Sequence, residues 1–197
     1  RLSLHVETSG ARRLPDDVIG VSLAGGPHRG AYVPIAHRYL GVATQLGLSE
    51  VLGKLGPVLE DAAVAKVMHD SKAEDVALRR QGIRVRGVEC DTMVASYLIN
   101  PERHQHRLDQ IAKERLGEAV APREELTHQG RGQTIAFSDV PIDRAAAYAA
   151  RVAETTLRLA PLLLAEVRAE GLESLMRDVE LPLASVLATI EIAGIRL

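Results

Sequence analysis

The sequence predicts an α/β fold, in which a mixed five-stranded sheet with its first three strands antiparallel is flanked by helices. Two observations support this prediction. Short strand-like segments separated by turn residues fill the first part of the 197-residue chain. The remainder has the pattern of helices, with two short apolar runs inserted among them. Hairpin-connected strands followed by strand–helix–strand–helix units are typical of a mixed sheet.

The first three strands follow from local pattern. Leu2, Leu4 and Val6 alternate with polar neighbours, which is the period-two pattern of a strand. Residues 18–23 and 31–35 form the next two apolar runs, and the residues between them are rich in Gly and include a Pro. A short turn between sequential runs favours antiparallel pairing.

The last two strands alternate with helices. Residues 64–68 and 85–90 are brief apolar runs that predict strands four and five. Residues 71–81 lie between them and predict a helix with Ser71 as its N-cap. Asp91 follows the fifth strand and is expected to cap the next helix.

The second half of the chain is predicted to be mainly helical. Residues 108–116 form a short helix that Gly117 ends, because glycine readily adopts the left-handed conformation found there. The polar, glycine-containing segment 117–134 is expected to be the most mobile stretch. An alanine-rich helix then spans residues 142–169, and Pro161 should kink it.

Composition narrows the possible functions. Apolar residues make up 46% of the chain and charged residues 25%, which is ordinary for a globular protein. The 24 basic and 26 acidic residues give a net charge of -2, so the chain lacks the excess of positive charge of a dedicated nucleic-acid binder. Aromatic residues are 3% of the chain, and Phe137 is the single Phe, so few rings can stack on bases.

The single cysteine and the hydropathy argue against disulfide-stabilised, cysteine-metal and membrane proteins. Cys90 stands alone, so neither a disulfide framework nor a cysteine metal cluster is expected, and a buried thiol is predicted. The sequence has no long uncharged apolar window, so we expect no membrane partner and a cytoplasmic location. Because the chain starts at Arg1 without a Met, we expect it to be a piece of a longer protein.

Five segments carry a family resemblance and occur in the order that the family requires. They are Ala31-Tyr32-Val33-Pro34, residues 91–101 (DTMVASYLINP), residues 106–112 (HRLDQIA), Tyr148-Ala149-Ala150 with Thr155-Thr156-Leu157, and Glu180-Leu181-Pro182-Leu183 with Gly194-Ile195-Arg196. Together they resemble the 3′-5′ exonuclease-like domain of bacterial family A DNA polymerases, the DNA polymerase I family. The resemblance implies a ribonuclease H-like exonuclease fold.

Active members of that family cleave a DNA 3′ end with two metal ions, which need a cluster of carboxylate ligands. The family's first motif is Asp-x-Glu on the first strand. In this chain Glu7 matches the motif, but His5 replaces the Asp. A neutral imidazole brings no negative charge and prefers softer metals than magnesium.

The other two motifs also depart from the family pattern. The second places an Asp four residues after an Asn, and here Asp70 and Glu74 take those positions. The third is Tyr-x-x-x-Asp on a helix; Tyr148 is present, but Val152 replaces the carboxylate. Glu154 does not repair the loss, because two residues along a helix it points roughly 200° away.

The resemblance therefore implies a domain with vestigial catalytic positions at His5, Glu7, Glu74, Tyr148 and Val152 and no intact catalytic set. We expect no proofreading activity, no cofactor and no metal ion for this fragment; if a metal ion were to bind, Glu7 and Glu74 would be its ligands. Val152 is expected to pack into the old cleft.

Two alternatives from other classes remain open. One is a residual or altered-metal 3′-5′ exonuclease, with a rearranged site built from His5, Glu7, Glu74 and either Asp70 or Asp75. The other is a nucleic-acid-binding module that keeps a single-strand cleft without cleavage. Metal binding and salt-dependent DNA binding would distinguish them from a structural domain.

The resemblance also implies how the chain is organised. Residues 1–170 correspond to the exonuclease-like domain and residues 171–197 to the start of a covalently attached polymerase domain. The implied parent enzyme is a DNA-directed DNA polymerase that uses Mg and engages a DNA primer-template. The apolar side chains of Leu157, Leu159 and residues 162–164 are expected to be covered by that polymerase domain.

Overall fold

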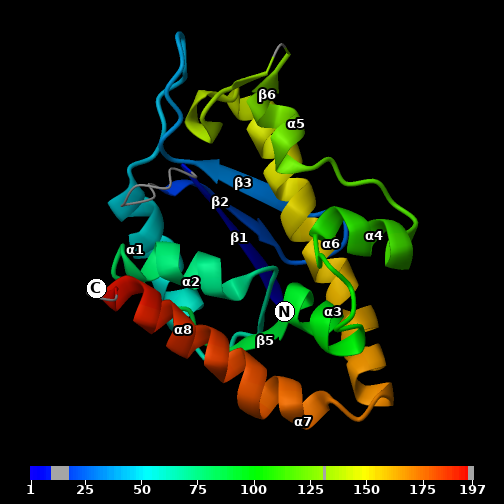
Figure 1. The fold of residues 1–197 in the computed structure, drawn as a ribbon. Coiled ribbons are helices and arrows are strands. Elements are labelled where there is room, and N and C mark those ends of the chain that lie inside the picture. Colours follow the sequence, from blue (N-terminus) through cyan, green and yellow to red (C-terminus); the bar gives the residue numbers. More distant parts are fainter. Residues whose placement is uncertain (10–17, 131, 195–197) are drawn as a thin grey trace.

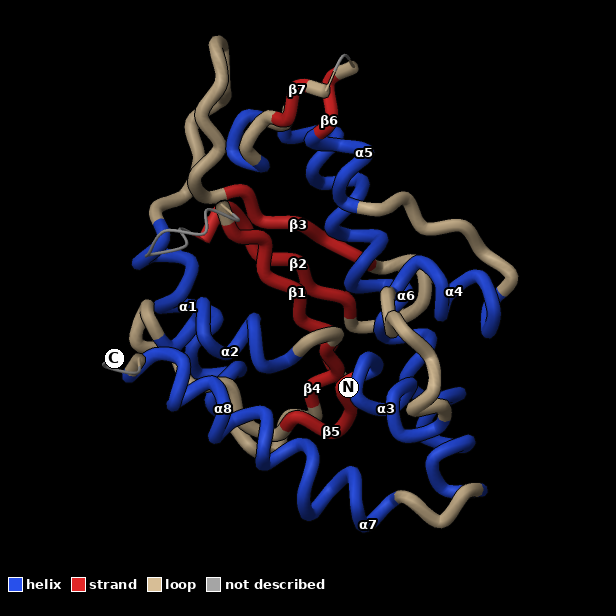
Figure 2. Tube along the Cα trace, viewed as in Figure 1, coloured by secondary structure: helices blue, strands red, loops and turns tan. Residues whose placement is uncertain are grey.

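The computed structural model describes residues 1–9, 18–130 and 132–194 and contains the predicted mixed five-stranded sheet. The strand order is β3-β2-β1-β4-β5, and the chain visits β1, β2 and β3 before it crosses to the other side of β1 (Figures 1 and 2). The strands span Leu2–Thr8 (β1), Val18–Ala24 (β2), Gly30–Pro34 (β3), Lys66–Met68 (β4) and Val88–Asp91 (β5).

Pairing within the sheet is mixed, as predicted. β1 and β2 are antiparallel, with Leu4 opposite Leu23, and β2 and β3 are antiparallel, with Val21 opposite Val33. β4 runs parallel to β1, and β5 runs parallel to β4. The carboxyl ends of β1, β4 and β5 therefore meet at one edge of the sheet, which is where α/β folds commonly place their sites.

Helices cover both faces of this sheet (Figure 1). The long helix α6 crosses β1, β2 and β3 and also packs against α3 and α4, while α8 packs along α2. The helices span Leu48–Glu60 (α1), Ser71–Arg79 (α2), Thr92–Ile99 (α3), Leu108–Leu116 (α4), Arg123–Thr127 (α5), Ile142–Ala169 (α6), Glu173–Leu175 (α7) and Leu181–Ala193 (α8). A 3-10 turn, η1, spans Phe137–Asp139, and a π-helical turn, η2, spans Met176–Glu180.

The core is built on the two faces of the sheet. On one face, Leu4 and Val6 of β1 pack against α1 and α2. On the other, Val67 and Cys90 pack against α3, α4 and α6. Burial of Cys90 confirms the predicted buried thiol, and it raises the pKa of that thiol, so the group stays protonated.

Helix α1 lies in the part of the chain expected to be mainly helical, but no range was predicted for it. Gly56 and Pro57 interrupt its sequence, and both residues disfavour the interior of a helix. Tertiary contacts compensate, because Leu52 and Leu59 of α1 are buried in the core on the α1–α2 face. Helices in proteins gain most of their stability from such packing and not from local propensity.

The N-cap of α2 was predicted one residue too late. Asp70, not Ser71, caps the helix, and its side chain accepts a hydrogen bond from the Ala73 amide at 3.4 Å. Asp70 has a φ of 62°, a left-handed conformation that Asp tolerates better than most residues. That conformation turns the chain sharply from β4 into α2.

The segment expected to be the most mobile contains regular structure. It holds α5 and a two-stranded ribbon of β6 (His128–Gln129) and β7 (Gln133–Thr134); residue 131 lies outside the described residues. The predicted helices ending at Gly117 and spanning residues 142–169 are confirmed, and α6 continues through Pro161 without ending there.

The apolar side chains of α6 are largely covered within this chain, contrary to expectation. Leu159 and Leu163 are buried in the core, and Leu157 and Leu164 pack against it; only Leu162 is substantially exposed. α3 and α4 provide the cover, since both pack on α6.

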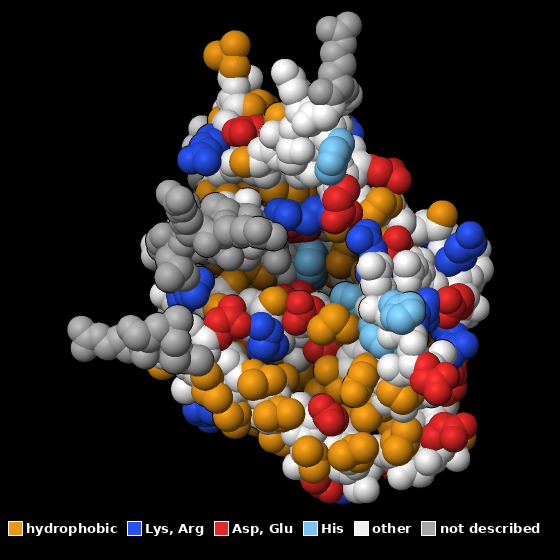
Figure 3. Space-filling view, viewed as in Figure 1, with side chains coloured by type: hydrophobic (Ala, Val, Ile, Leu, Met, Phe, Trp, Pro, Cys, Tyr) orange, Lys and Arg blue, Asp and Glu red, His pale blue; other side chains and the backbone are white. Residues whose placement is uncertain are grey.

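Instead, the exposed apolar surface lies on α8. Leu183, Val186, Leu187 and Ile190 are 42 to 53% exposed and lie on one side of the helix, and Figure 3 shows hydrophobic side chains gathered over this part of the molecule. The inward side of α8 carries the small side chains of Ala184, Ser185 and Ala188, of which Ala188 is fully buried. An ordinary surface helix turns its large apolar side chains inward, whereas α8 leaves these four exposed.

No helix in the described part of the chain combines the length and the uncharged apolar character needed to cross a bilayer.

Candidate functional site

The site lies at the sheet edge where β1, β4 and β5 end. His5 and Glu7 stand near the end of β1, His69 directly follows β4, and Glu74 lies in the first turn of α2. Histidine side chains are visible in the hollow of this face, between α5 and α2 (Figure 3).

His5 bridges two carboxylates. Its Nδ1 lies 2.8 Å from Glu74 Oε1, and its Nε2 lies 2.9 Å from Glu7 Oε1, both within hydrogen-bond distance. The side chains of Glu7 and Glu74 are only 2% and 5% exposed. When both carboxyl groups are ionised, both ring nitrogens must donate, and only the imidazolium has two N–H donors.

The pKa shifts agree with that protonation state. Burial opposes the charged ring, but the hydrogen bonds and negative charges of Glu7 and Glu74 outweigh it and raise the pKa of His5 to about 10. Burial also raises the pKa of Glu74 to about 7 despite its contact with His5. For Glu7, burial is outweighed by His5 and Arg123, which lower the pKa. The three side chains therefore retain a proton that an isolated histidine would lose at neutral pH.

Arg123 adds a second positive charge beside Glu7 and Glu74, and it was not identified as a site residue from the sequence. Its Nε donates to Glu7 Oε2 at 3.1 Å, and its Nη2 donates to the Thr8 carbonyl at 2.7 Å. The guanidinium also lies 5.0 Å from the centroid of the Phe137 ring, a cation–π distance. No local sequence pattern predicts this contact, because Arg123 is 116 residues from Glu7. Arg123 is also the first residue of α5, a helix that was not predicted.

Asp91, predicted to cap one helix, caps two. Its Oδ1 accepts hydrogen bonds from the amides of Met93 and Val94 in α3 at 2.9 and 3.3 Å. The same carboxylate accepts hydrogen bonds from the backbone amides of Asp70 and Ser71 at the start of α2, at 3.2 and 2.6 Å. Asp91 thus joins the first turns of α2 and α3 behind the site.

Tyr148 and Val152 share one face of α6, as their spacing predicts. Both line the same cavity of about 190 Å³ with His5 and His69. Val152 is only 4% exposed and packs in the core, so an apolar side chain stands where the family has a carboxylate. Burial raises the pKa of the Tyr148 hydroxyl, which therefore stays protonated.

Glu154 points away from this cavity, in agreement with the helical geometry. It pairs with Arg151 at 3.1 Å and Arg158 at 3.3 Å. Both arginines also contact Glu118, so a separate surface network satisfies Glu154.

The other acidic candidates do not complete a metal site. Asp70 lines a cavity with His5 and Glu74 but is engaged as the α2 cap. Asp75 faces another side of α2 and pairs with Arg79 at 2.6 Å. Within residues 1–9, 18–130 and 132–194, no group of three or more His, Cys, Asp or Glu side chains is arranged to hold a metal ion.

The donor set therefore does not fit the two-metal centre that the resemblance implies. His5 and Arg123 together supply two positive charges beside the two remaining carboxyl groups, and an imidazolium has no free nitrogen lone pair with which to ligate a metal ion. The Val152 side chain offers no ligand atom. Two divalent cations held close together need a cluster of carboxylates, and the two carboxyl groups left here are both engaged by His5.

We predict that NMR will find the pKa values of His5 and His69 displaced in opposite directions. His5 should titrate near pH 10, whereas burial lowers the pKa of His69 to about 4, so His69 is neutral. Since the folded-state pKa of His5 lies above its unfolded value of 6.5, its contribution to stability is complete below pH 6.5 and is lost as pH rises to 10. Side-chain 13C spectra from pH 3 to 11 measure both values.

The Glu7→Gln variant provides the control for this titration. It removes one of the two charges that hold the proton on His5, so the pKa of His5 should fall while that of His69 changes less. A His5 that titrates at or below pH 6.5 in the unmodified chain would show that the bridge is not an imidazolium.

The sheet order, with acidic side chains at the shared edge of β1 and α2 and a tyrosine-bearing helix across them, defines a ribonuclease H-like domain of the exonuclease type. Over residues 4–158 the chain matches the family described as DNA polymerase I, ribonuclease H-like domain, and it belongs to that family.

Similar curated proteins are much longer than this chain. DNA polymerase I of Pseudomonas aeruginosa is 36% identical over 196 residues, covering 98% of this chain and 21% of the relative. DNA polymerase I of Chloroflexus aurantiacus is 35% identical over 197 residues, covering 99% of this chain and 20% of the relative. The chain thus spans about a fifth of the length of these relatives.

Solved structures show the same fold. The polymerase structure titled POL domain of Pol1 from M. smegmatis in complex with DNA primer-template and dNTP has a TM-score of 0.76 at 23% identity, covering all of this chain and 29% of that one. Escherichia coli RNase D, described as an exoribonuclease, has a TM-score of 0.69 at 19% identity, covering 96% of this chain and 45% of that one.

Proposed function

We propose that this exonuclease-like domain has no proofreading activity and serves as a structural support for an attached polymerase domain. The observation that carries the proposal is the His5 bridge. The imidazolium lies between Glu7 and Glu74, at the position where the family resemblance places a metal-binding carboxylate. His5, together with Arg123 on Glu7, thereby supplies the positive charge that metal ions provide in an active exonuclease.

The support role rests on the orientation of α8. Polar contacts fix α8 to α2: Arg79 donates to Ser185 and Thr189 at 2.6 and 2.7 Å, and Lys72 pairs with Glu191 at 2.6 Å. These contacts leave the apolar stripe of α8 facing outward. In the proposal, residues 171–197 begin the polymerase domain, and further parts of that domain cover the stripe.

The proposed parent enzyme is a DNA-directed DNA polymerase of the cytoplasm that extends a primer-template with Mg. Two findings support this: the named relatives are DNA polymerases I, and the similar polymerase structure contains a primer-template. In that parent enzyme the present domain serves as a rigid scaffold, because the ion pairs of His5 and Arg123 with Glu7 and Glu74 hold the former catalytic cleft together within the domain.

Metal titration combined with a nuclease assay tests the loss of activity. We expect no binding of manganese or magnesium at millimolar concentrations by calorimetry, and no shortening of a 5′-labelled single-stranded oligonucleotide. The reason is that the His5 imidazolium repels the cation and Val152 supplies no ligand. Shortening from the 3′ end that disappears in Glu7→Gln would establish the altered-metal exonuclease instead.

A restored variant is the matched comparison for this assay. Combining His5→Asp, Glu74→Asp and Val152→Asp returns the family's carboxylates to the same three positions. We expect this variant to bind manganese, with 3′ shortening as the second readout. If it folds, as judged by circular dichroism, but binds no manganese, then the three substitutions do not explain the loss of the metal site.

A further inference from the structure

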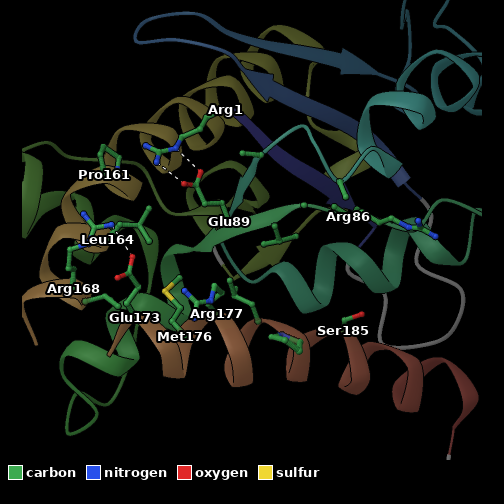
Figure 4. Close-up of a pocket in the computed structure, with 18 of the residues that line it drawn as sticks. Arg1, Arg86, Glu89, Pro161, Leu164, Arg168, Glu173, Met176, Arg177 and Ser185 are labelled. Atoms are coloured by element: carbon green, nitrogen blue, oxygen red, sulfur yellow. Dashed lines mark hydrogen bonds and ion pairs between the residues drawn. The ribbon is translucent and has the colours of Figure 1, made fainter. Parts of the chain in front are cut away.

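A second cleft lies away from the His5 site. It is bounded by the segment that leads into β5, the C-terminal half of α6 and the helices α7, η2 and α8, and it encloses about 710 Å³ (Figure 4). That volume lies within the range of about 300 to 1,000 Å³ common for binding sites. None of the five vestigial catalytic positions lines it.

The cleft has an apolar floor. Leu164 of α6, Met176 of η2 and Leu181 of α8 line it, together with Val88 of β5. Met176 is only 2% exposed, so the floor continues directly into the core. Apolar side chains of a bound partner would be removed from water here, which is the main source of affinity at such sites.

The rim of the cleft carries more positive than negative charge. Four arginines face two carboxylates among the residues that line it: Arg1, Arg86, Arg168 and Arg177, with Glu89 and Glu173. Figure 4 shows that these arginines come from different parts of the chain and are spread along the cleft, with Arg168 near one end and Arg86 near the other.

The internal pairs do not use all of these guanidinium groups. Within the described ranges, the side chain of Arg86 makes no hydrogen bond or ion pair. The guanidinium group binds carboxylates in a bidentate fork, so a free one favours an anionic partner. The other three arginines pair within the chain at 2.6 to 2.9 Å: Arg1 with Glu89, Arg168 with Glu173 and Arg177 with Asp178.

We propose that this cleft binds an acidic peptide segment of a partner protein, with apolar side chains on the floor and carboxylates on the arginine rim. Charge complementarity favours this occupant: Arg86 gives the rim a positive charge that no internal pair among the described residues neutralises, while the chain as a whole has a net charge of -2. A guanidinium without a partner in the described part of the chain, such as that of Arg86, can form a bidentate pair with a carboxylate of the segment.

Fluorescence anisotropy with a designed probe tests the proposal. The probe is a fluorescein-labelled peptide of glutamates around a central Leu-Phe pair, and its twin has glutamines in place of the glutamates. We expect the acidic probe to bind and the neutral twin to bind about tenfold more weakly, a difference of about 1.4 kcal/mol. Rising salt should weaken only the acidic probe.

Two pairs of variants locate the binding. Ala165 and Ala169 are both exposed on α6, but only Ala165 lines the cleft, so Ala165→Trp should abolish binding and Ala169→Trp should not. Arg84 and Arg86 are both exposed, but only Arg86 lines it, so Arg86→Glu should weaken binding and Arg84→Glu should not.

Three results would overturn the proposal. The acidic probe could fail to bind, it could bind equally to all four variants, or a single-stranded oligonucleotide could displace it at equal charge concentration. The last result would identify a general polyanion surface in place of a peptide site.

Discussion

Replacing Asp91 with Ala is expected to lower the free energy of unfolding by about 3 to 5 kcal/mol. One carboxylate, only 1% exposed, accepts hydrogen bonds from the first-turn amides of both α2 and α3. Alanine would leave these amides without an acceptor and remove negative charge from two helix N-termini. Urea unfolding followed by circular dichroism measures the change.

Two further substitutions distinguish the stability lost with the helix cap from the stability lost with any negative charge. The Asp91→Asn variant can keep the hydrogen bonds made by Oδ1, but its side-chain amide would face the Ser71 N–H, so an intermediate loss is expected. Asp109→Ala removes a first-turn carboxylate of α4 that pairs only at the surface with Arg107, and should cost less than about 1 kcal/mol. Equal effects of Asp91→Ala and Asp109→Ala would contradict the double cap.

Replacing Gly30 with Ala is expected to cost about 2 to 4 kcal/mol. A Cβ at this position of β3 would lie 2.3 Å from the carbonyl oxygen of Ala150 in α6. The obstacle is helix backbone, which cannot rotate away as a side chain can. The sheet and α6 would have to separate, and with them the contact that places Tyr148 and Val152 over the site.

Gly25→Ala is the matched control in the same β2–β3 hairpin. A Cβ at Gly25 meets nothing within 4 Å. The free energy of unfolding of this variant should therefore differ by less than about 0.5 kcal/mol from that of the unmodified chain. Thermal or urea unfolding of the two variants side by side gives the comparison. The close packing of β3 on α6 is contradicted if both variants are equally stable.

Local signals predicted the elements whose ends have strong chemical markers. Gly117 ends α4 in the left-handed conformation, and the alanine-rich pattern of α6 has the predicted limits. The prediction failed where local propensity and tertiary packing disagree. Helix α1 forms despite Gly56 and Pro57, because its buried leucines gain more from the core than those residues cost.

Five motif segments in the family's order carried the resemblance that implies the ribonuclease H-like fold, and the sequence itself shows a valine at position 152. The sequence also assigned Asp91 to the cap of α3, which is a contact between neighbours in the chain. The valine and the cap are local properties, so they can be identified along the chain without knowing which distant segments meet, whereas the fold was inferred through the resemblance.

The roles of the remaining polar residues became visible only in the folded chain. His5 meets Glu74 across 69 positions of sequence, and Glu7 meets Arg123 across 116. The protonation of His5, and so its role as an internal cation, depends on those distances and on the exclusion of water around them. A pattern of residue types along a chain does not contain either quantity, because both arise only when distant segments pack together.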